Sequence, residues 1–276
     1  MDQPDLLETL NARSLLDQLL DDSRLYKNGE HYKNLLDFVV QLRNFAPFNA
    51  MLLHIQKPGV IHAASARDWR DRFNRTIKSQ ARPLLILWPF GPVALVYDLM
   101  DNEGAPLPPG VSAFTAHGTV NHLALEDFAQ RIRKNGIEWK KIDAGDGSAG
   151  SISRLSWPTE PGVHSHYRMN VNRNHDPNVQ FATLTHELAH LYLGHLGKDK
   201  HLGIPERQVR SVEQRELEAE SAAFIICARN GVDNLSASYL TDYVNRNTTT
   251  EQLDLYQIMR ATGQVEALLG LSGHTR

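Results

Sequence analysis

The sequence FATLTHELAHLYLGH occupies residues 181–195 and contains the pattern H-E-x-x-H at His186, Glu187 and His190. Two histidines four positions apart lie one turn above each other on a helix, so both imidazoles can reach one metal ion. The glutamate beside the first histidine can reach a water at that ion and accept its proton. The stretch therefore predicts a helix that holds Zn2+, with Glu187 as the general base.

The surroundings of the motif indicate that this helix is buried. Apolar residues lie around it at Leu184, Leu188, Leu191 and Leu193, and Gly194 is suited to end it. Polar side chains buried without partners cost several kcal/mol. Two histidines and a glutamate on such a helix therefore favour a metal site over a packed core.

A hydrolytic zinc site takes three protein ligands and leaves one position open, so a third ligand is needed. The metzincin pattern would require glycine and histidine where this sequence has Leu193 and Leu196. That class is disfavoured. On a continuing helix His195 would point away from His186. We therefore expect His195 to be a polar residue at the helix end rather than the ligand.

The acidic run RELEAE at 215–220 offers a better third ligand, because it opens a strongly apolar helical segment. Glu216 and Glu220 are four residues apart and share a helix face. One carboxylate can bind the metal while the other holds the distal N–H of a ligand imidazole. We prefer Glu216 as the ligand and Glu220 as its supporting partner. The reverse assignment is the alternative.

Composition limits the class of protein. The chain has 276 residues, enough for one large or two modest domains, and 41% hydrophobic with 22% charged residues suits a soluble globular protein. Apolar runs are too short for a transmembrane span, and the acidic N-terminus lacks a signal-peptide pattern. The single cysteine, Cys227, lies in an apolar helix. We expect a cytoplasmic protein with no membrane partner and a buried thiol.

Charge is distributed unevenly along the chain. Residues 24–98 contain eleven basic and five acidic residues, a net charge of +6, although the whole chain has −3. A basic segment in an acidic protein can follow a phosphate backbone. It can equally be a solvated surface, so charge alone leaves both readings open.

Periodicity predicts an α+β fold that is mainly helical. A small twisted sheet is expected to pack on the zinc helix, as in a minimal gluzincin-like metallopeptidase, after an α+β N-terminal region. The strand at 166–171 precedes the zinc helix, and we expect its edge to pair with an extended peptide. The Pro- and Gly-rich stretch 101–110 is the predicted linker. Helices are predicted over 5–22, 32–44, 49–56, 123–134, 236–244 and 249–269, with strands over 84–88, 93–97, 137–142, 151–155 and 166–171.

The quoted motif, followed by RELEAESAAFIICARNGVD at 215–233, resembles the zinc-peptidase domains of ArdC-like and ImmA/IrrE-like proteins. In that group two motif histidines and a glutamate on the following helix hold the zinc. The resemblance implies that His186, His190 and Glu216 are the ligands and that Glu187 is the catalytic base. The residues alone led to the same preferred set, with Glu220 as the alternative to Glu216.

The N-terminal half resembles the ArdC N-terminal region. The similar stretches are FAPFNAMLLHIQKP at 45–58, Trp69, PLLILWPFGPVALVYDLMDNEG at 83–104 and AFTAHG at 113–118. The resemblance implies an N-terminal region over 1–105 that binds single-stranded DNA and a zinc metallopeptidase domain over 106–276. Bases would stack on aromatic rings and phosphates would meet basic side chains. The candidate DNA contacts are Trp69, Arg70, Arg72, Arg75 and Lys78.

Two functions follow from these observations. The first is a zinc endopeptidase that cleaves a protein substrate and is recruited to single-stranded DNA. The alternative is a single-stranded DNA-binding protein of the antirestriction type, whose zinc site is structural or vestigial. A peptidase also needs a donor for the developing oxyanion. The candidates for that donor are His164, His166, His175 and Tyr192.

Overall fold

The computed structural model describes residues 29–88, 91–107, 120–144, 148–158, 160, 163–232 and 253–271. The predicted helices at 5–22 and 236–244 lie outside this part. The described part combines helices with small sheets, which confirms the predicted α+β class. Among the helices described, none has the length and apolar character needed to cross a membrane.

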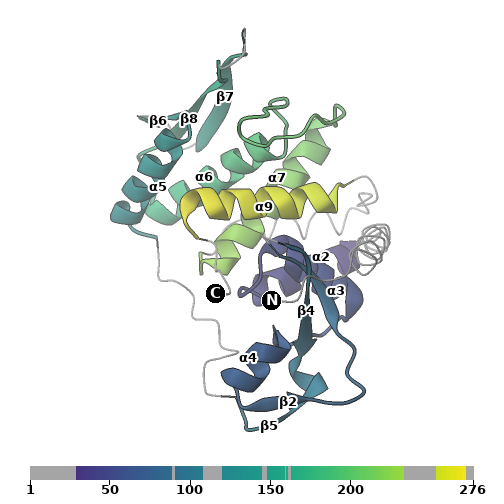
Figure 1. Cartoon of the computed structure of the whole chain (residues 1–276). Helices are drawn as coiled ribbons and strands as arrows, with labels where there is room; N and C mark the ends of the chain where they lie inside the picture. The colour runs from purple at the N-terminus through teal and green to yellow at the C-terminus, as the bar shows by residue number, and fades with distance from the viewer. Residues whose placement is uncertain are drawn as a thin grey trace.

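One end of the molecule is built from a helix beside a three-stranded sheet (Figure 1), whose elements are α5 (His122–Lys134), β6 (Ile137–Ile142), β7 (Gly150–Ser156) and β8 (His166–Asn172). The middle strand is β8, parallel to β6 and antiparallel to β7. Alternate side chains along β8 enter the core, where Tyr167, Met169 and Val171 are buried.

The described helices at the centre of the molecule (Figure 1) are α2 (Gly29–Gln41), α3 (Pro47–Gln56), α6 (Pro177–Tyr192), α7 (Val212–Arg229) and α9 (Leu255–Leu269). The H-E-x-x-H motif lies on α6, which packs on α7, α9 and β7. Further along the core, α2 packs on α7 and α3 packs on α9. Helices from both ends of the chain thus surround the motif-bearing helix and its neighbours.

The strand that precedes the motif helix does not offer a free edge. β8 is paired on both sides, so the prediction that its edge receives a peptide is wrong. In the described part β7 pairs with β8 alone, and it also contacts α6. The unpaired strand edge beside the motif therefore belongs to β7.

Buried polar contacts fix the N-terminal helices to the later ones. The hydroxyl of Tyr32 on α2 donates to Oγ of Ser221 on α7 at 2.6 Å. Arg229 on α7 pairs with Glu266 on α9 at 2.7 Å and also donates to the carbonyl of Val39 on α2. The domain division near residue 105 stays a prediction. Helices that precede it share one core with α7 and α9.

A small lobe lies at the end of the molecule opposite the β6–β8–β7 sheet (Figure 1). Its elements are β1 (Ala63–Ala64), α4 (Ala66–Asp71), β2 (Arg75–Ile77), β3 (Leu84–Trp88), β4 (Gly91–Asp98), the 3-10 turn η2 (Leu99–Asp101) and β5 (Asn102–Gly104). One sheet has the order β1–β4–β3, and β2 pairs with β5. β5 lies within the predicted linker at 101–110, so that segment begins as part of this lobe.

Candidate metal centre

Two packed helices position the candidate site. Pro177 stands in the first turn of α6, where its missing N–H costs no hydrogen bond. α7 begins with a capping box, in which Ser211 and Gln214 each bond to the other's backbone. Leu188 on α6 and Ala219 on α7 are fully buried. A well-defined start and a buried contact hold each helix in a fixed register on the other.

This register brings three candidate ligands together. The Nε2 atoms of His186 and His190 on α6 are 3.0 Å apart. Oε2 of Glu216 on α7 lies 3.4 Å from Nε2 of His186 and 3.5 Å from Nε2 of His190. Each residue offers one ligand atom to the cluster. In the described part of the chain this is the one group of three or more such residues close enough to hold a metal.

The spacing and charge of the cluster suit a zinc ion. Four tetrahedral ligands with bonds of about 2.1 Å lie about 3.4 Å from one another, close to the separations seen here. Burial disfavours a charged imidazole, but the carboxylates of Glu216 and Glu220 outweigh it and raise the pKa of His186 to about 10. Hydrogen bonds from His186 and His190 hold the pKa of Glu216 well below its usual range. The donor set therefore favours a cation.

The structure separates the two carboxylates that the sequence left as alternatives. Oε1 of Glu220 lies 3.3 Å from Nδ1 of His186, on the side of the ring away from the ligand cluster. Glu216 instead meets the Nε2 atoms of both histidines. These positions are the ones expected if Glu216 is a ligand and Glu220 orients an imidazole, and both roles stay predictions.

Glu187 lies between the candidate ligands and the sheet. Burial raises the pKa of its carboxyl, and nearby His186 and His190 act in the opposite direction. The backbone N–H of Ile152 on β7 also donates to this carboxyl. A carboxyl with a raised pKa can accept a proton and later release it, which is what a general base in this position must do.

His195 is not in the ligand cluster, but it contacts one of its members, which we did not expect from the sequence. Its Nδ1 lies 2.8 Å from Nδ1 of His190, and its Nε2 lies 3.0 Å from Oε2 of Glu218. Arg207 in turn binds Glu218 with both terminal nitrogens. The signal was present in the sequence, because Gly194 ends the helix and turns the chain back on itself.

Trp69 does not support the expected stacking on DNA bases. Its side chain is fully buried, and Nε1 donates to the carbonyl of Tyr97 at 2.8 Å. The ring packs near His62 and Phe73 in the core of the small lobe. The assignment of Trp69 as a base-stacking residue is therefore wrong, because a base cannot reach a ring with no exposed surface.

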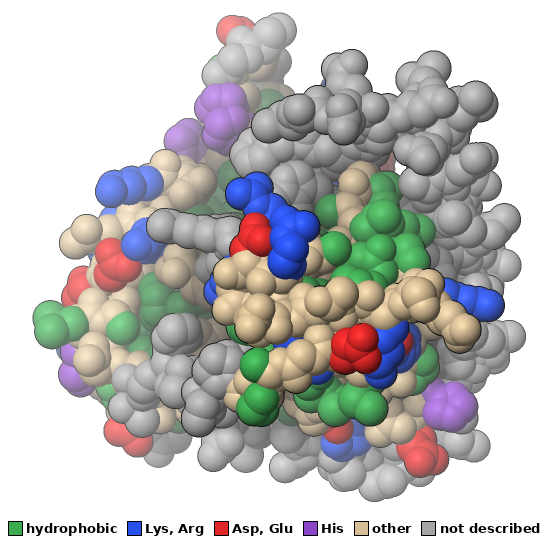
Figure 2. All heavy atoms as spheres, turned by 60° about the horizontal axis from the view of Figure 1, so that its bottom comes forward, with side chains coloured by type: hydrophobic (Ala, Val, Ile, Leu, Met, Phe, Trp, Pro, Cys, Tyr) green, Lys and Arg blue, Asp and Glu red, His purple; other side chains and the backbone are tan. Residues whose placement is uncertain are grey.

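The basic candidates in the same lobe are largely engaged by the protein itself. Arg70 pairs with Asp71, and Arg72 lies 3.7 Å from Asp68, although both arginines remain exposed. Figure 2 brings this lobe forward and shows basic and acidic side chains next to each other.

Two further basic residues bind backbone. Arg75 donates to the Gly104 carbonyl at 3.2 Å, and Lys78 donates to the Met100 carbonyl at 2.9 Å. They tie β2 to the η2 and β5 segment. DNA binding by these residues stays a prediction.

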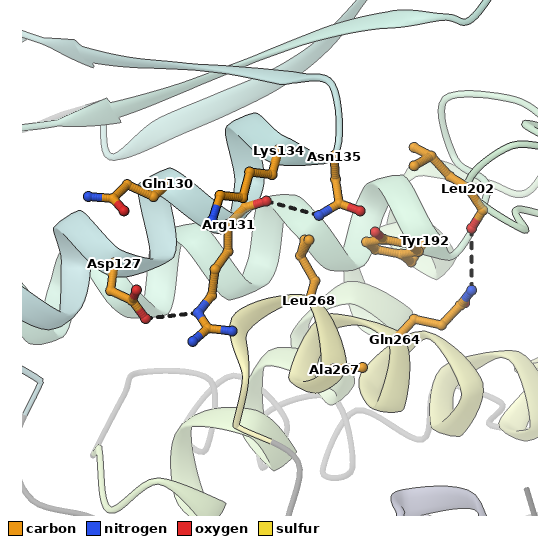
Figure 3. Close-up of a pocket in the computed structure, with 10 residues that line it drawn as sticks. All are labelled: Asp127, Gln130, Arg131, Lys134, Asn135, Tyr192, Leu202, Gln264, Ala267 and Leu268. Atoms are coloured by element: carbon orange, nitrogen blue, oxygen red, sulfur yellow. Dashed lines mark hydrogen bonds and ion pairs between the residues drawn. The ribbon is translucent and has the colours of Figure 1, made fainter.

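The candidates for the oxyanion donor are scattered. Tyr192 lines an open hollow of about 590 Å³ between α5, α9 and the end of α6 (Figure 3), which none of the candidate ligands lines. The imidazole of His164 stacks on His201 with ring centroids 3.8 Å apart. The described contacts of these side chains do not include the ligand cluster, so the oxyanion donor stays unassigned.

A helix carrying H-E-x-x-H, joined by a glutamate from a second helix, defines a metallopeptidase-like domain. Residues 141–252 match the model of a peptidase family, the IrrE N-terminal-like domain. The matched residues contain β7, β8, α6 and α7 with the whole ligand cluster.

Among solved structures, the chain is similar to the metal-free crystal structure of the antirestriction protein ArdC from plasmid R388. The two share 14% identity over 81% of this chain and 82% of that one, with a TM-score of 0.35. A likeness of this size carries no argument about function. No curated protein matches the chain.

Proposed function

We propose that this protein is a zinc-dependent endopeptidase that hydrolyses a protein substrate. The observation that carries the proposal is the cluster of His186, His190 and Glu216, whose ligand atoms have the mutual spacing of a tetrahedral zinc site. Glu187 follows the first ligand directly and has the raised pKa that a general base needs. The match of residues 141–252 to the model of a peptidase family supports the same conclusion.

Bound zinc would supply a Lewis acid that polarises the scissile carbonyl and lowers the pKa of water. The protein's own contribution is the handling of the proton. Glu187 accepts a proton from the attacking water and delivers it to the leaving amine. The Ile152 N–H holds this carboxyl in place, and burial keeps its pKa high enough for the proton to be carried. Glu220 fixes the ring of His186 through Nδ1.

The substrate is proposed to bind as an extended strand along β7. The Ile152 N–H reaches Glu187, so it points away from β8 and toward the motif helix. In the described part this edge of β7 has no strand partner. A peptide added there would form backbone hydrogen bonds that hold it in register beside the general base. Main-chain recognition of this kind tolerates many sequences, so selectivity would come from side-chain contacts.

The test compares the wild-type protein with Glu187→Gln on a library of unstructured peptides, with new termini counted by mass spectrometry. Glutamine has the size of glutamate but cannot accept the proton. We expect Glu187→Gln to retain zinc and to lose cleavage by at least about 100-fold, the lower end of a general base's contribution. The exposed Glu206→Gln is the matched control and should cleave normally. Cleavage retained by Glu187→Gln, or none by the zinc-loaded wild type, would refute the proposal.

A further inference from the structure

We propose that His195, Glu218 and Arg207 form a hydrogen-bonded chain that positions His190, and this inference rests on the proposed metal site. Nδ1 of His190 lies 2.8 Å from Nδ1 of His195. Nε2 of His195 lies 3.0 Å from Oε2 of Glu218. Arg207 donates to both carboxylate oxygens of Glu218, at 2.7 and 2.8 Å. His195, Glu218 and Arg207 all lie outside the ligand cluster.

The direction of the chain follows from counting donors and acceptors. His190 can bind a metal through Nε2 only if that nitrogen carries no proton, and Nε2 is the atom that faces His186 and Glu216. A neutral His190 then has its proton on Nδ1 and donates it to Nδ1 of His195. His195 must therefore carry its own proton on Nε2, which it donates to Glu218. One arrangement of protons satisfies every contact.

The far end of the chain is a carboxylate that cannot turn away. Glu218 is fully buried on α7, and two charge-assisted bonds from Arg207 fix both of its oxygens. Arg207 also donates to the carbonyl of Leu193 at the end of α6. The backbone N–H of Asp254 is a further donor to Glu218 at 3.3 Å. The hydrogen-bonded chain therefore connects His190 to a rigidly held carboxylate, that of Glu218.

The sequence places His195 beside His190 through the way α6 ends. Gly194 adopts a φ of +79°, and its N–H bonds to the Leu191 carbonyl. The next N–H, of His195, bonds to the carbonyl of His190 at 3.1 Å. Together these bonds form a Schellman motif, which folds the residue after the glycine back over the last turn. An apolar contact often accompanies this motif, whereas here two imidazoles meet.

The two candidate histidine ligands are thus supported differently. Glu220 contacts His186 directly through Nδ1. His190 reaches its carboxylate through an intervening imidazole. Partners of this kind fix the orientation of a ligand ring and raise its basicity, and their loss costs about 10- to 100-fold in metal affinity. His195 is therefore a positioning residue whose loss should weaken metal binding.

The experiment measures the zinc dissociation constant of the full chain by competition with a fluorescent chelator. We expect His195→Leu to bind zinc about 10- to 100-fold more weakly than the wild type. His195→Asn should restore binding to within about threefold, because its amide oxygen can accept from His190 as Nδ1 does. The exposed His122→Leu on α5 is the matched control and should not change affinity.

A purely structural role for His195 predicts a different pattern, in which any folded variant binds zinc normally. Equal affinity of folded His195→Leu and wild type would overturn the inference while leaving the metal site intact. Failure of the wild type to bind zinc would overturn the proposed function and this inference together.

Side-chain NMR of the zinc-loaded wild type gives a second readout that depends on no variant. We expect protons on Nδ1 of His190 and Nε2 of His195. If His195→Leu does not fold, the absence of a proton on Nδ1 of His190 would overturn the inference and its presence would support it.

Discussion

The buried pair of Arg229 and Glu266 gives the sharpest prediction about the fold. Arg229 on α7 is 4% exposed and Glu266 on α9 is 2% exposed, and their charged groups are 2.7 Å apart. Arg229 also donates to the carbonyls of Val39 and Phe45 at 2.9 Å each. One side chain therefore links α9 to the N-terminal helices. The substitution Arg229→Met keeps an apolar chain of similar length and removes all of these bonds.

We expect Arg229→Met to lower the free energy of unfolding by about 3–5 kcal/mol, because it leaves an uncompensated buried carboxylate. Burial raises the pKa of Glu266 above its unfolded value, and Arg229 opposes that rise. The variant loses this opposition, so the pKa of Glu266 rises further. Below the unfolded pKa of about 4.3, the folded variant holds Glu266 as a neutral acid. As the pH rises through the higher pKa of Glu266 in the folded state, the free energy of unfolding falls. The deficit should be larger at pH 8 than at pH 5.

Urea unfolding followed by tryptophan fluorescence at both pH values measures this effect, at one fixed zinc concentration. Lys33→Met removes an exposed pair with Asp37 and is the control, with an expected loss of about 0.3–0.5 kcal/mol. Adding Glu266→Leu to Arg229→Met should recover part of the loss. A loss below about 1 kcal/mol, or one that does not change with pH, would show that the pair does not hold these helices together.

Three further predictions concern the site and the small lobe. Glu216→Ala should reduce zinc affinity more than Glu220→Ala, as measured by chelator competition, and equal losses would remove the distinction between ligand and supporting partner. Trp69→Ala should cost about 3–5 kcal/mol in urea unfolding because the indole is fully buried, and a neutral effect would contradict its burial. If the lobe binds single-stranded DNA, fluorescence anisotropy should show salt-dependent binding of an oligonucleotide that weakens in Arg70→Gln/Arg72→Gln; no binding at low salt removes DNA as a partner.

Local spacing made the centre of the site predictable. His186 and His190 are one helical turn apart, and so are Glu216 and Glu220, so each pair is fixed by its own helix. The meeting of the two helices was inferred from the shared chemistry of their side chains. The structure adds the distances between them, which the sequence could not supply.

Features that depend on distant parts of the chain were less accessible. The alternating pattern of β8 shows a strand but does not reveal which strands lie beside it, so its central position was missed. Trp69 lies among arginines in the sequence, yet its ring turns into the lobe to reach the carbonyl of Tyr97. For His195, the assumption of a continuing helix outweighed the glycine that precedes it. A glycine that reverses the chain places the next side chain over the last helical turn.

Zinc K-edge X-ray absorption of the metal-loaded protein tests the central claim most directly. We predict one zinc per chain, with two imidazole nitrogens and carboxylate or water oxygens at about 2.0–2.2 Å and no sulfur ligand. The signal from two imidazoles should fall to that of one in His190→Ala. A protein that retains no zinc, a spectrum with a sulfur ligand, or an unchanged imidazole count in that variant would contradict the proposed centre at His186, His190 and Glu216.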